Sequence, residues 1–338
     1  MTNFTTRADY DQAISNLPVA DQTAIDAATD RQGQLTKPPG SLGRLEDLAI
    51  WMAGWRGVEK PQINAASCLI FAGNHGIAAL GVSAFPSDVT AQMVGNFAAG
   101  GAAINQLTKS AGASLDVIAL DLENPTADFT QGPAMTEDET LDAMAKGAAA
   151  IPDQADMLLV GEMGIGNTTA AAAVSMASLG GDASTWVGRG TGVDDQGLKL
   201  KADVINRGIA ANQDLIASGF GILSALAGRE MAAIAGAVLA ARHRRIPVLL
   251  DGFISTASAL PLLKDNPQAL DHCLISHRSQ EPGHHQIIEK TGMMPLLDLG
   301  MRLGEGSGAA TALPIVKSAL AAHNGMATFA EAGVSGAS

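Results

Sequence analysis

Short, almost uninterrupted runs of apolar residues recur along the chain, separated by longer alanine-rich stretches with helical patterns. Runs of this length without polar alternation are typical of strands buried on both faces. The runs cover residues 67–73, 115–121, 156–162, 184–188, 247–252 and 272–276. Their alternation with helices predicts a doubly wound, Rossmann-like α/β fold, in which helices flank a mostly parallel sheet.

The two ends of the chain have helical patterns instead. Residues 1–61 contain an amphipathic segment, a proline turn at KPPGS and a second helical segment. Residues 293–338 are helical in pattern, with breaks at GEGSG and HNG. We therefore expect a large α/β domain over residues 62–292 that carries the ligand site. Residues 1–61 and 293–338 would form a smaller helical domain that completes the site.

Composition and charge exclude several classes of partner. The 338 residues are 47% hydrophobic but only 4% aromatic, and 38 are glycine. This mixture suits helices packed closely on a sheet, and it does not suit a platform on which nucleic-acid bases stack. The formal net charge of −13 repels nucleic acid and anionic membranes. We expect neither as a partner.

Three further features indicate a cytoplasmic protein. Cys68 and Cys273 lie in apolar runs, which predicts buried thiols in a reducing compartment and no disulfide. The N-terminal residues lack the pattern of a signal peptide, and the longest apolar stretch, 231–241, is too short to span a bilayer. The basic run at 242–245 follows that stretch and is typical of a helix C-terminus.

Glycine-rich or polar segments follow the apolar runs. In an open parallel sheet the carboxyl ends of the strands share one edge, where ligands bind. Any one of these segments alone would be an ordinary turn, but together they predict one composite site. They are GNHG (73–76), DLEN (121–124), GEMGIGN (161–167), GRGTG (188–192), DGF (251–253) and SHRSQEPGH (276–284).

The segment 161–178 has the strongest local signal, which is that of a phosphate cradle. Its glycines let backbone N–H groups approach an anion, and a helix begins at Asn167, Thr168 and Thr169. The alternative is a plain threonine-capped helix after a glycine turn. The segment matches neither GxGxxG nor GxxxxGK[ST], which disfavours a dinucleotide dehydrogenase and a P-loop NTPase. Lys201, after the next glycine loop, could supply the missing positive charge.

The remaining chemistry points to isolated carboxylates. His277, His284 and His75 have no cysteine or carboxylate at a spacing typical of zinc, so hydrogen bonding is the better interpretation. No GxSxG, HExxH or CxxC motif is present. Glu162 and Glu305 lie among glycines, where a carboxylate is suited to holding a substrate N–H or accepting its proton. A solvated loop charge is the alternative for Glu305.

Taken together, the motifs resemble those of the nicotinate-nucleotide:dimethylbenzimidazole phosphoribosyltransferases. The match runs in order from about residue 35 to residue 333, and it is specific as a set. The motifs are KPPGSLGRLEDLA, FAGNHG, GVSAFPSDVTAQMV, GEMGIGNTT, GRGTG, DGFISTASAL, SHRSQEPGH and LDLGMRLGEGSGAA.

The resemblance implies a reaction and a catalytic residue. The family transfers the phosphoribosyl group of nicotinate mononucleotide to dimethylbenzimidazole and thereby helps to build the lower nucleotide loop of cobalamin. Nicotinate leaves, and alpha-ribazole phosphate forms with inversion at the anomeric carbon, without a metal or other cofactor. The glutamate of the RLGEGSGA motif, here Glu305, is the family's general base. Glu331 is a weaker candidate for that role.

The resemblance also implies the binding residues and a homodimer in which the KPPGS segment helps to complete the partner's site. Glu162, Gly164, Gly166, Asn167 and Thr168 would hold the nucleotide. Gly190, Lys201 and Ser279 would complete the phosphate pocket. Ser83, Phe85, Gln92, Met163 and Leu303 would line the base pocket.

Two other functions stay open at this point. One is the same transfer to another lower-ligand base, such as adenine, a different benzimidazole or a phenol, which residues 83–92 would decide. The other is a non-catalytic protein that binds nicotinate mononucleotide, which predicts binding without turnover. Isolated carboxylates at Glu162 and Glu305 weigh against it, because binding alone requires no base.

Overall fold

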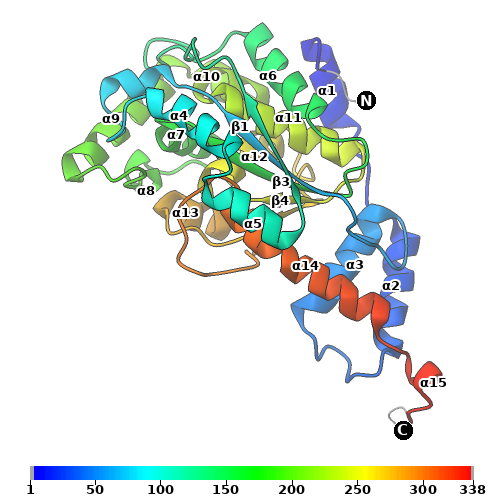
Figure 1. Ribbon diagram of the computed structural model, residues 1–338. Coiled ribbons are helices and arrows are strands. Elements are labelled where there is room, and N and C mark those ends of the chain that lie inside the picture. The colour runs from blue at the N-terminus through cyan, green and yellow to red at the C-terminus, as the bar shows by residue number, and fades with distance from the viewer. Residues whose placement is uncertain (1–3, 336–338) are drawn as a thin grey trace.

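The computed structural model describes residues 4–335, and its centre is a five-stranded parallel sheet (Figure 1). The strand order is β2-β1-β3-β4-β5, with all pairs parallel. This order confirms the predicted doubly wound α/β fold. The strands are β1 (Ala66–Ala72), β2 (Ser114–Ala119), β3 (Met157–Met163), β4 (Val248–Leu250) and β5 (Cys273–Ile275).

Helices bury β1, β3, β4 and β5 from both sides, which explains why their sequences are almost continuously apolar. The edge strand β2 differs from the prediction, because its residues are exposed or half-buried. Leu69 and Leu158 belong to the core on one face, whereas Ile70 and Leu159 belong to the core on the other. The first face is covered by α6 (Glu137–Ala149), α7 (Asn167–Leu179), α10 (Gly219–Leu226), α11 (Arg229–His243) and α12 (Phe253–Asp265). The second is covered by α4 (Asp88–Ala98), α5 (Ala103–Ala111) and α14 (Ser307–Gly325), and α3 (Arg44–Arg56) packs on α14.

Five further elements lie between these helices and strands along the chain. They are η1 (Gly76–Leu80), α8 (Ala183–Trp186), α9 (Asp195–Ala211), η2 (Leu215–Ala217) and α13 (Pro282–Thr291).

The prediction of a strand at 184–188 is wrong, because this segment forms α8. Its Trp186 is fully buried, and the indole N–H donates to the Gly180 carbonyl (3.0 Å). An apolar run of five residues does not distinguish a buried strand from one buried helical turn. Residues 293–306 also lack the predicted helix and run as an extended loop into α14.

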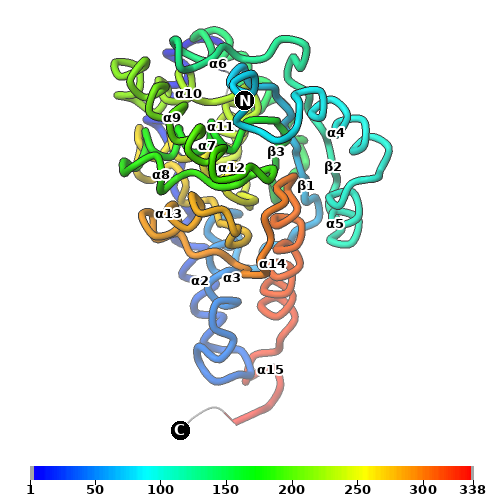
Figure 2. Tube along the Cα trace, turned by 90° about the vertical axis from the view of Figure 1, so that its left-hand side faces the viewer, coloured from blue at the N-terminus to red at the C-terminus, as the bar shows by residue number. Residues whose placement is uncertain are grey.

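The helices at the two ends of the chain pack in two places, and the predicted domain bounds stay a prediction. The helices α2 (Gln22–Gln34) and α3 project from the sheet with the C-terminal half of α14 and with α15 (Phe329–Ala332) (Figures 1 and 2). The N-terminal half of α14, however, packs on the sheet. The helix α1 (Arg7–Ser15) packs beside α11, with Tyr10 buried against Phe220.

Several smaller predictions agree with the structure. Cys68 and Cys273 are free and buried. The basic run at 242–245 ends α11, where Arg244 donates to the Ile151 carbonyl (3.0 Å). None of the helices described for residues 4–335 is long and apolar enough to cross a membrane.

Candidate active site

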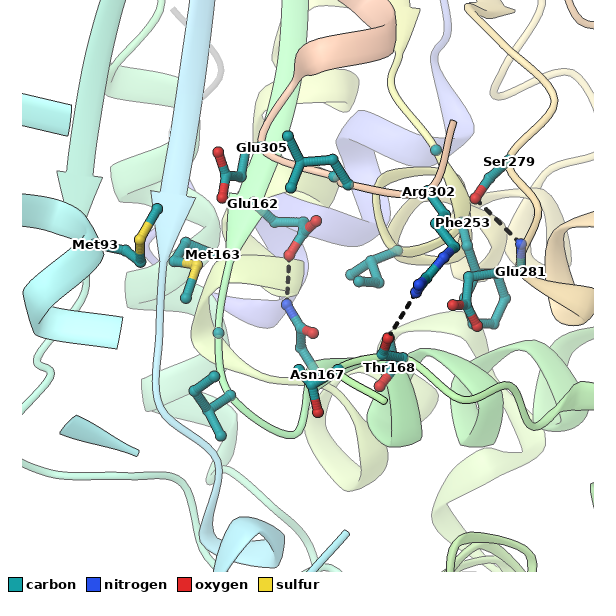
Figure 3. Close-up of a pocket in the computed structure, with 18 of the residues that line it drawn as sticks. Met93, Glu162, Met163, Asn167, Thr168, Phe253, Ser279, Glu281, Arg302 and Glu305 are labelled. Carbon is teal, nitrogen blue, oxygen red and sulfur yellow. Dashed lines mark hydrogen bonds between the residues drawn. The ribbon is translucent and has the colours of Figure 1, made fainter. Parts of the chain in front are cut away.

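A cavity of about 370 Å³ lies at the carboxyl edge of the sheet (Figure 3). Its walls come from the segments that follow β3, β4 and β5, from the glycine loop at 188–192 and from the turn that precedes α14. The predicted composite site is therefore assembled from four of the six exit segments. The other two lie outside the cavity lining, and His75 of GNHG instead pairs with buried Glu230 (2.7 Å).

Glu162 lies at the end of β3 and faces the cavity, although only 5% of its surface is exposed. The Asn167 side-chain amide donates a hydrogen bond to it. Burial, together with the charges of Asp251, Glu230 and Glu305, raises the pKa of Glu162 to about 8. Most molecules therefore carry a proton on this carboxyl at pH 7, so that the group can donate a hydrogen bond.

The start of α7 has features that favour a bound anion. Its N-cap, Gly166, has φ 95°, and no side chain caps the helix. The Lys201 ammonium donates to the Thr168 hydroxyl (3.3 Å) and to the Gly188 carbonyl (2.9 Å). Burial lowers the pKa of Lys201. Uncapped helix N–H groups beside a buried ammonium favour a bound phosphate.

Glu281 and Arg302 complete this end of the cavity. The Arg302 guanidinium donates to the Gly190 carbonyl (3.2 Å), and the Ser279 hydroxyl accepts from the Glu281 N–H (3.3 Å). Burial raises the pKa of Glu281, and the charges of Lys201 and Arg302 oppose that shift. Glu281 lies in SHRSQEPGH and Arg302 in LDLGMRLGEGSGAA, yet no local sequence pattern distinguishes either residue from an ordinary surface charge.

Glu305 occupies the turn before α14 in a left-handed conformation. Gly304, Glu305 and Gly306 have φ of 83°, 60° and 74°. Such a conformation is uncommon for a residue with a Cβ, and it holds the side chain against the cavity. The turn lies directly on β3, where a Cβ on Gly161 would collide with the Gly306 backbone.

The surroundings of Glu305 exclude a solvated loop charge. Only 8% of the residue is exposed, and burial and the Asp251 carboxylate raise its pKa. Arg302, the nearest basic residue in sequence, is bonded to the Gly190 carbonyl instead. Figure 3 shows Glu305 and Glu162 at one end of the cavity, with Thr168, Ser279 and Glu281 toward the other.

The wall beside Glu305 is apolar and open to solvent. Met93 and Met163 line it, while Phe85 and Leu303 are 52% and 55% exposed at its mouth. A flat aromatic ring could enter here and reach the Glu305 carboxylate. His284, which sequence reasoning assigned to hydrogen bonding, accepts from the Ser279 N–H (3.0 Å).

Most of the predicted site residues line this cavity, although their roles stay predictions. Those in the lining are Phe85, Glu162, Met163, Gly164, Asn167, Thr168, Gly190, Ser279, Leu303 and Glu305. Four lie outside it. Gly166 caps α7, Lys201 lies behind Thr168, Ser83 bonds to Thr191 (3.0 Å), and Gln92 is exposed on α4.

His277, which the sequence assigned to hydrogen bonding, also lines the cavity. Sequence reasoning missed the other lining residues, which are Val89, Met93, Ile165, Thr191, Gly252, Phe253, Ile254, Glu281, Arg302 and Gly304. Many of them fall inside the motifs that were singled out, so the motif boundaries were a better guide than the individual choices. Within residues 4–335, no group of three or more His, Cys, Asp or Glu side chains is placed to hold a metal ion.

Comparison with known proteins identifies the family. A family model described as phosphoribosyltransferase matches residues 17–334. The nicotinate-nucleotide–dimethylbenzimidazole phosphoribosyltransferase of Ruegeria sp. (strain TM1040) is 55% identical over 335 residues, 99% of each chain. The chain belongs to the nicotinate-nucleotide–dimethylbenzimidazole phosphoribosyltransferase family. The family's protein from Novosphingobium aromaticivorans is 57% identical over 334 residues, again 99% of each chain.

Solved structures of this phosphoribosyltransferase family have the same fold. The crystal structure of the Thermus thermophilus enzyme superposes with a TM-score of 0.87 at 39% identity. The alignment covers 94% of this chain and all of that one. Together, the fold and the cavity at the carboxyl edge of its sheet belong to a phosphoribosyltransferase.

Proposed function

We propose that Glu305 is the general base with which this enzyme transfers the phosphoribosyl group of nicotinate mononucleotide to dimethylbenzimidazole. The products are alpha-ribazole 5'-phosphate and nicotinate. The observation that supports this role most directly is the position of Glu305, a buried carboxylate of raised pKa beside the apolar wall of the cavity.

The chemistry places its main demand on the incoming base. Nicotinate leaves from a pyridinium nitrogen that is already cationic, so the bond to the anomeric carbon breaks without an acid. One benzimidazole nitrogen attacks that carbon while the opposite ring N–H gives up its proton. A carboxylate at that N–H makes the ring a better nucleophile, and a raised pKa makes the carboxylate a stronger base.

The nucleotide would bind between the two ends of the cavity. Its phosphate fits the start of α7, beside Thr168, Lys201 and the Gly190 loop. Glu162 carries a proton at neutral pH and can donate a hydrogen bond to the nucleotide without adding a negative charge. This arrangement leaves the anomeric carbon facing Glu305 and the apolar wall.

We infer that the enzyme is a cytoplasmic homodimer. Free, buried thiols suit a reducing compartment. Phe85 and Leu303, half exposed at the cavity mouth, leave apolar surface that a second copy could cover. The KPPGS segment of that copy is our candidate for completing the site.

The test follows nicotinate release by chromatography, with purified protein, nicotinate mononucleotide and a panel of bases. Release that depends on dimethylbenzimidazole is the expected result. Release with adenine or a phenol alone would assign a different acceptor, and binding of the mononucleotide without release would indicate a carrier.

The Glu305→Gln variant tests the base directly. It should bind the mononucleotide normally and lose about 100-fold or more in kcat, which is typical of a missing general base. Near-normal turnover with dimethylbenzimidazole would contradict the assignment. A phenolic acceptor would make this variant less informative, because a phenol has no second ring nitrogen.

A further inference from the structure

Asp251 has no assigned role, yet its carboxylate is hydrogen-bonded to the backbone next to Glu305. It follows β4 directly and is fully buried. One carboxylate oxygen accepts the N–H groups of Gly308 (2.6 Å) and Ala309 (3.0 Å), and the other accepts the N–H of Gly306 (3.1 Å).

This carboxylate takes the place of a helix cap. The N-cap residue of α14 is Gly306, which has no side chain to offer, and no cap is supplied by the helix itself. The first N–H groups of α14 are therefore satisfied by a residue 55 positions earlier in the chain. Because Gly306 is the neighbour of Glu305, the same bonds fix the turn in which Glu305 has positive φ.

The position of Asp251 is itself fixed. The Ser276 hydroxyl donates to its main-chain carbonyl (2.7 Å). The His277 ring lies 3.8 Å from its carboxylate, lines the cavity and packs against Gly308. Ser276 and His277, which follow β5, thus hold the Asp251 carboxylate in place against the turn before α14.

We propose that Asp251 is a positioning residue for the general base, because its bonds to the start of α14 hold the turn that carries Glu305. The inference rests on the proposed role of Glu305. Burial raises the pKa of Asp251, and His277 and the three N–H donors oppose that shift. Burial and Asp251 in turn raise the pKa of Glu305.

Other titratable and charged groups lie near the same two carboxylates. Glu162 on β3 faces both, Cys68 on β1 and His277 after β5 face Asp251, and Arg302 precedes Glu305 in its own loop. A change in the pH profile must therefore be assigned by substitution at Asp251 itself.

The Asp251→Asn variant separates positioning from general support of the fold. Its amide oxygen can still accept from Gly308 and Ala309, but its NH₂ group would face the Gly306 N–H, so the bond next to Glu305 is lost. We expect kcat to fall about 10- to 100-fold with the KM for nicotinate mononucleotide within about threefold. The acidic limb of the kcat profile should move to lower pH, because a negative charge near Glu305 is removed.

Asp156→Asn is the matched control. Asp156 is also buried and also accepts two backbone N–H groups, from Asn64 (2.6 Å) and Ala65 (3.1 Å), but it lies before β3, at the opposite edge of the sheet. This variant should lose thermal stability and keep both kcat and the acidic limb. An Asp251→Asn variant that behaves like the control would overturn the inference.

The Glu305→Gln variant, measured in parallel, keeps the two ideas distinguishable. Loss of the acidic limb in Glu305→Gln, with an unmoved limb in Asp251→Asn, would leave the general base standing and remove Asp251 from its role. A limb that survives in Glu305→Gln would reject the general base instead.

A second readout uses the wild-type protein, in case Asp251→Asn does not fold. The sequence contains one Glu-Gly pair, Glu305–Gly306, so labelling glutamate carbonyls with ¹³C and glycine nitrogens with ¹⁵N selects the Gly306 amide. This amide should resonate downfield, exchange slowly and shift with the same midpoint as the acidic limb. Rapid exchange, or an unchanged shift across that limb, would overturn the inference.

Discussion

Two helices begin beside each other at the active-site edge of the sheet, and their first turns are used in opposite ways. Both α7 and α14 have an N-cap glycine with positive φ, Gly166 and Gly306, and neither is capped by its own side chain. At α14 the buried carboxylate of Asp251 accepts three of the free N–H groups. At α7 the first turn lines the cavity through Asn167 and Thr168, and the Lys201 ammonium lies behind Thr168.

The difference shows how one physical property can either hold a catalytic group or bind a substrate. A helix N-terminus attracts negative charge. Where the chain supplies that charge internally, the result is a rigid turn, as at Glu305. Where the chain places no carboxylate at the helix N-terminus and adds a buried cation, the result is a site that an external phosphate can fill.

The largest expected effect comes from giving α7 the internal anion that it lacks. In Thr168→Asp, the new carboxylate would lie near the Lys201 ammonium and the helix N-terminus. Because it occupies the place proposed for the substrate phosphate, the apparent KM for nicotinate mononucleotide should rise about 100-fold or more. Initial rates over a wide concentration range measure this.

The corresponding change at α14 is the control. Ser307→Asp introduces a carboxylate into a buried position where Asp251 already occupies the helix start. This variant should lower the melting temperature, whereas Thr168→Asp should leave it equal or slightly higher. A normal KM in Thr168→Asp would move the phosphate site away from α7.

The second-largest effect is expected in the pH dependence of stability, and it comes from the Glu162 carboxyl. The pKa of Glu162 is raised to about 8, from an ordinary value of 4.5. The folded chain therefore keeps a proton that the unfolded chain releases over this interval. The stability that this proton provides is complete below pH 4.5 and is lost as the pH rises to about 8.

Glu162→Gln removes that pH dependence while keeping an acceptor for the Asn167 amide. Its melting temperature relative to the wild type should increase between pH 5 and pH 8.5, by roughly 3 °C or more. Differential scanning calorimetry at several pH values measures the trend. Glu331→Gln, on exposed α15, is the control and should show no such increase above pH 6. A constant difference for Glu162→Gln would mean that Glu162 is ionised in the folded protein.

The sheet and the location of the site could be predicted from the sequence because both depend on local patterns. Uninterrupted apolar runs identified all five strands, and parallel strands necessarily bring their carboxyl ends to one edge. Glu162 and Glu305 could be selected because carboxylates among glycines are unusual. The strand predicted at 184–188 failed because its apolar pattern was too short to have a period.

The capping of α14 could not be predicted, because it depends on tertiary contact. DGF was recognised as an exit segment, but its pattern does not indicate that Asp251 meets a helix start 55 residues later. Glu281 and Arg302 were missed for the same reason, since their charges acquire a function only where the 188–192 loop approaches them. Local sequence specifies the strands and turns, whereas the electrostatic relations between loops arise when the sheet assembles.

The smallest effect is expected at a third helix start, α10, which is also capped by a carboxylate from elsewhere. Asp265 accepts the N–H groups of Gly219 (2.6 Å) and Phe220 (3.1 Å) and the hydroxyl of Tyr10 (2.6 Å). Tyr10→Phe removes only the last bond and keeps the ring against Phe220, at 5.1 Å between centroids.

We expect Tyr10→Phe to lower the free energy of unfolding by about 1.5–3 kcal/mol, the usual contribution of a hydrogen bond to a charged group. Urea denaturation measures this loss, and kcat and its pH profile should not change. A shifted acidic limb would mean that capping carboxylates elsewhere in this fold also influence Glu305. If the acidic limb is unchanged in Tyr10→Phe and shifted in Asp251→Asn, the effect on Glu305 is specific to the cap of α14. Of these two capped helices, α14 is the one that begins next to Glu305.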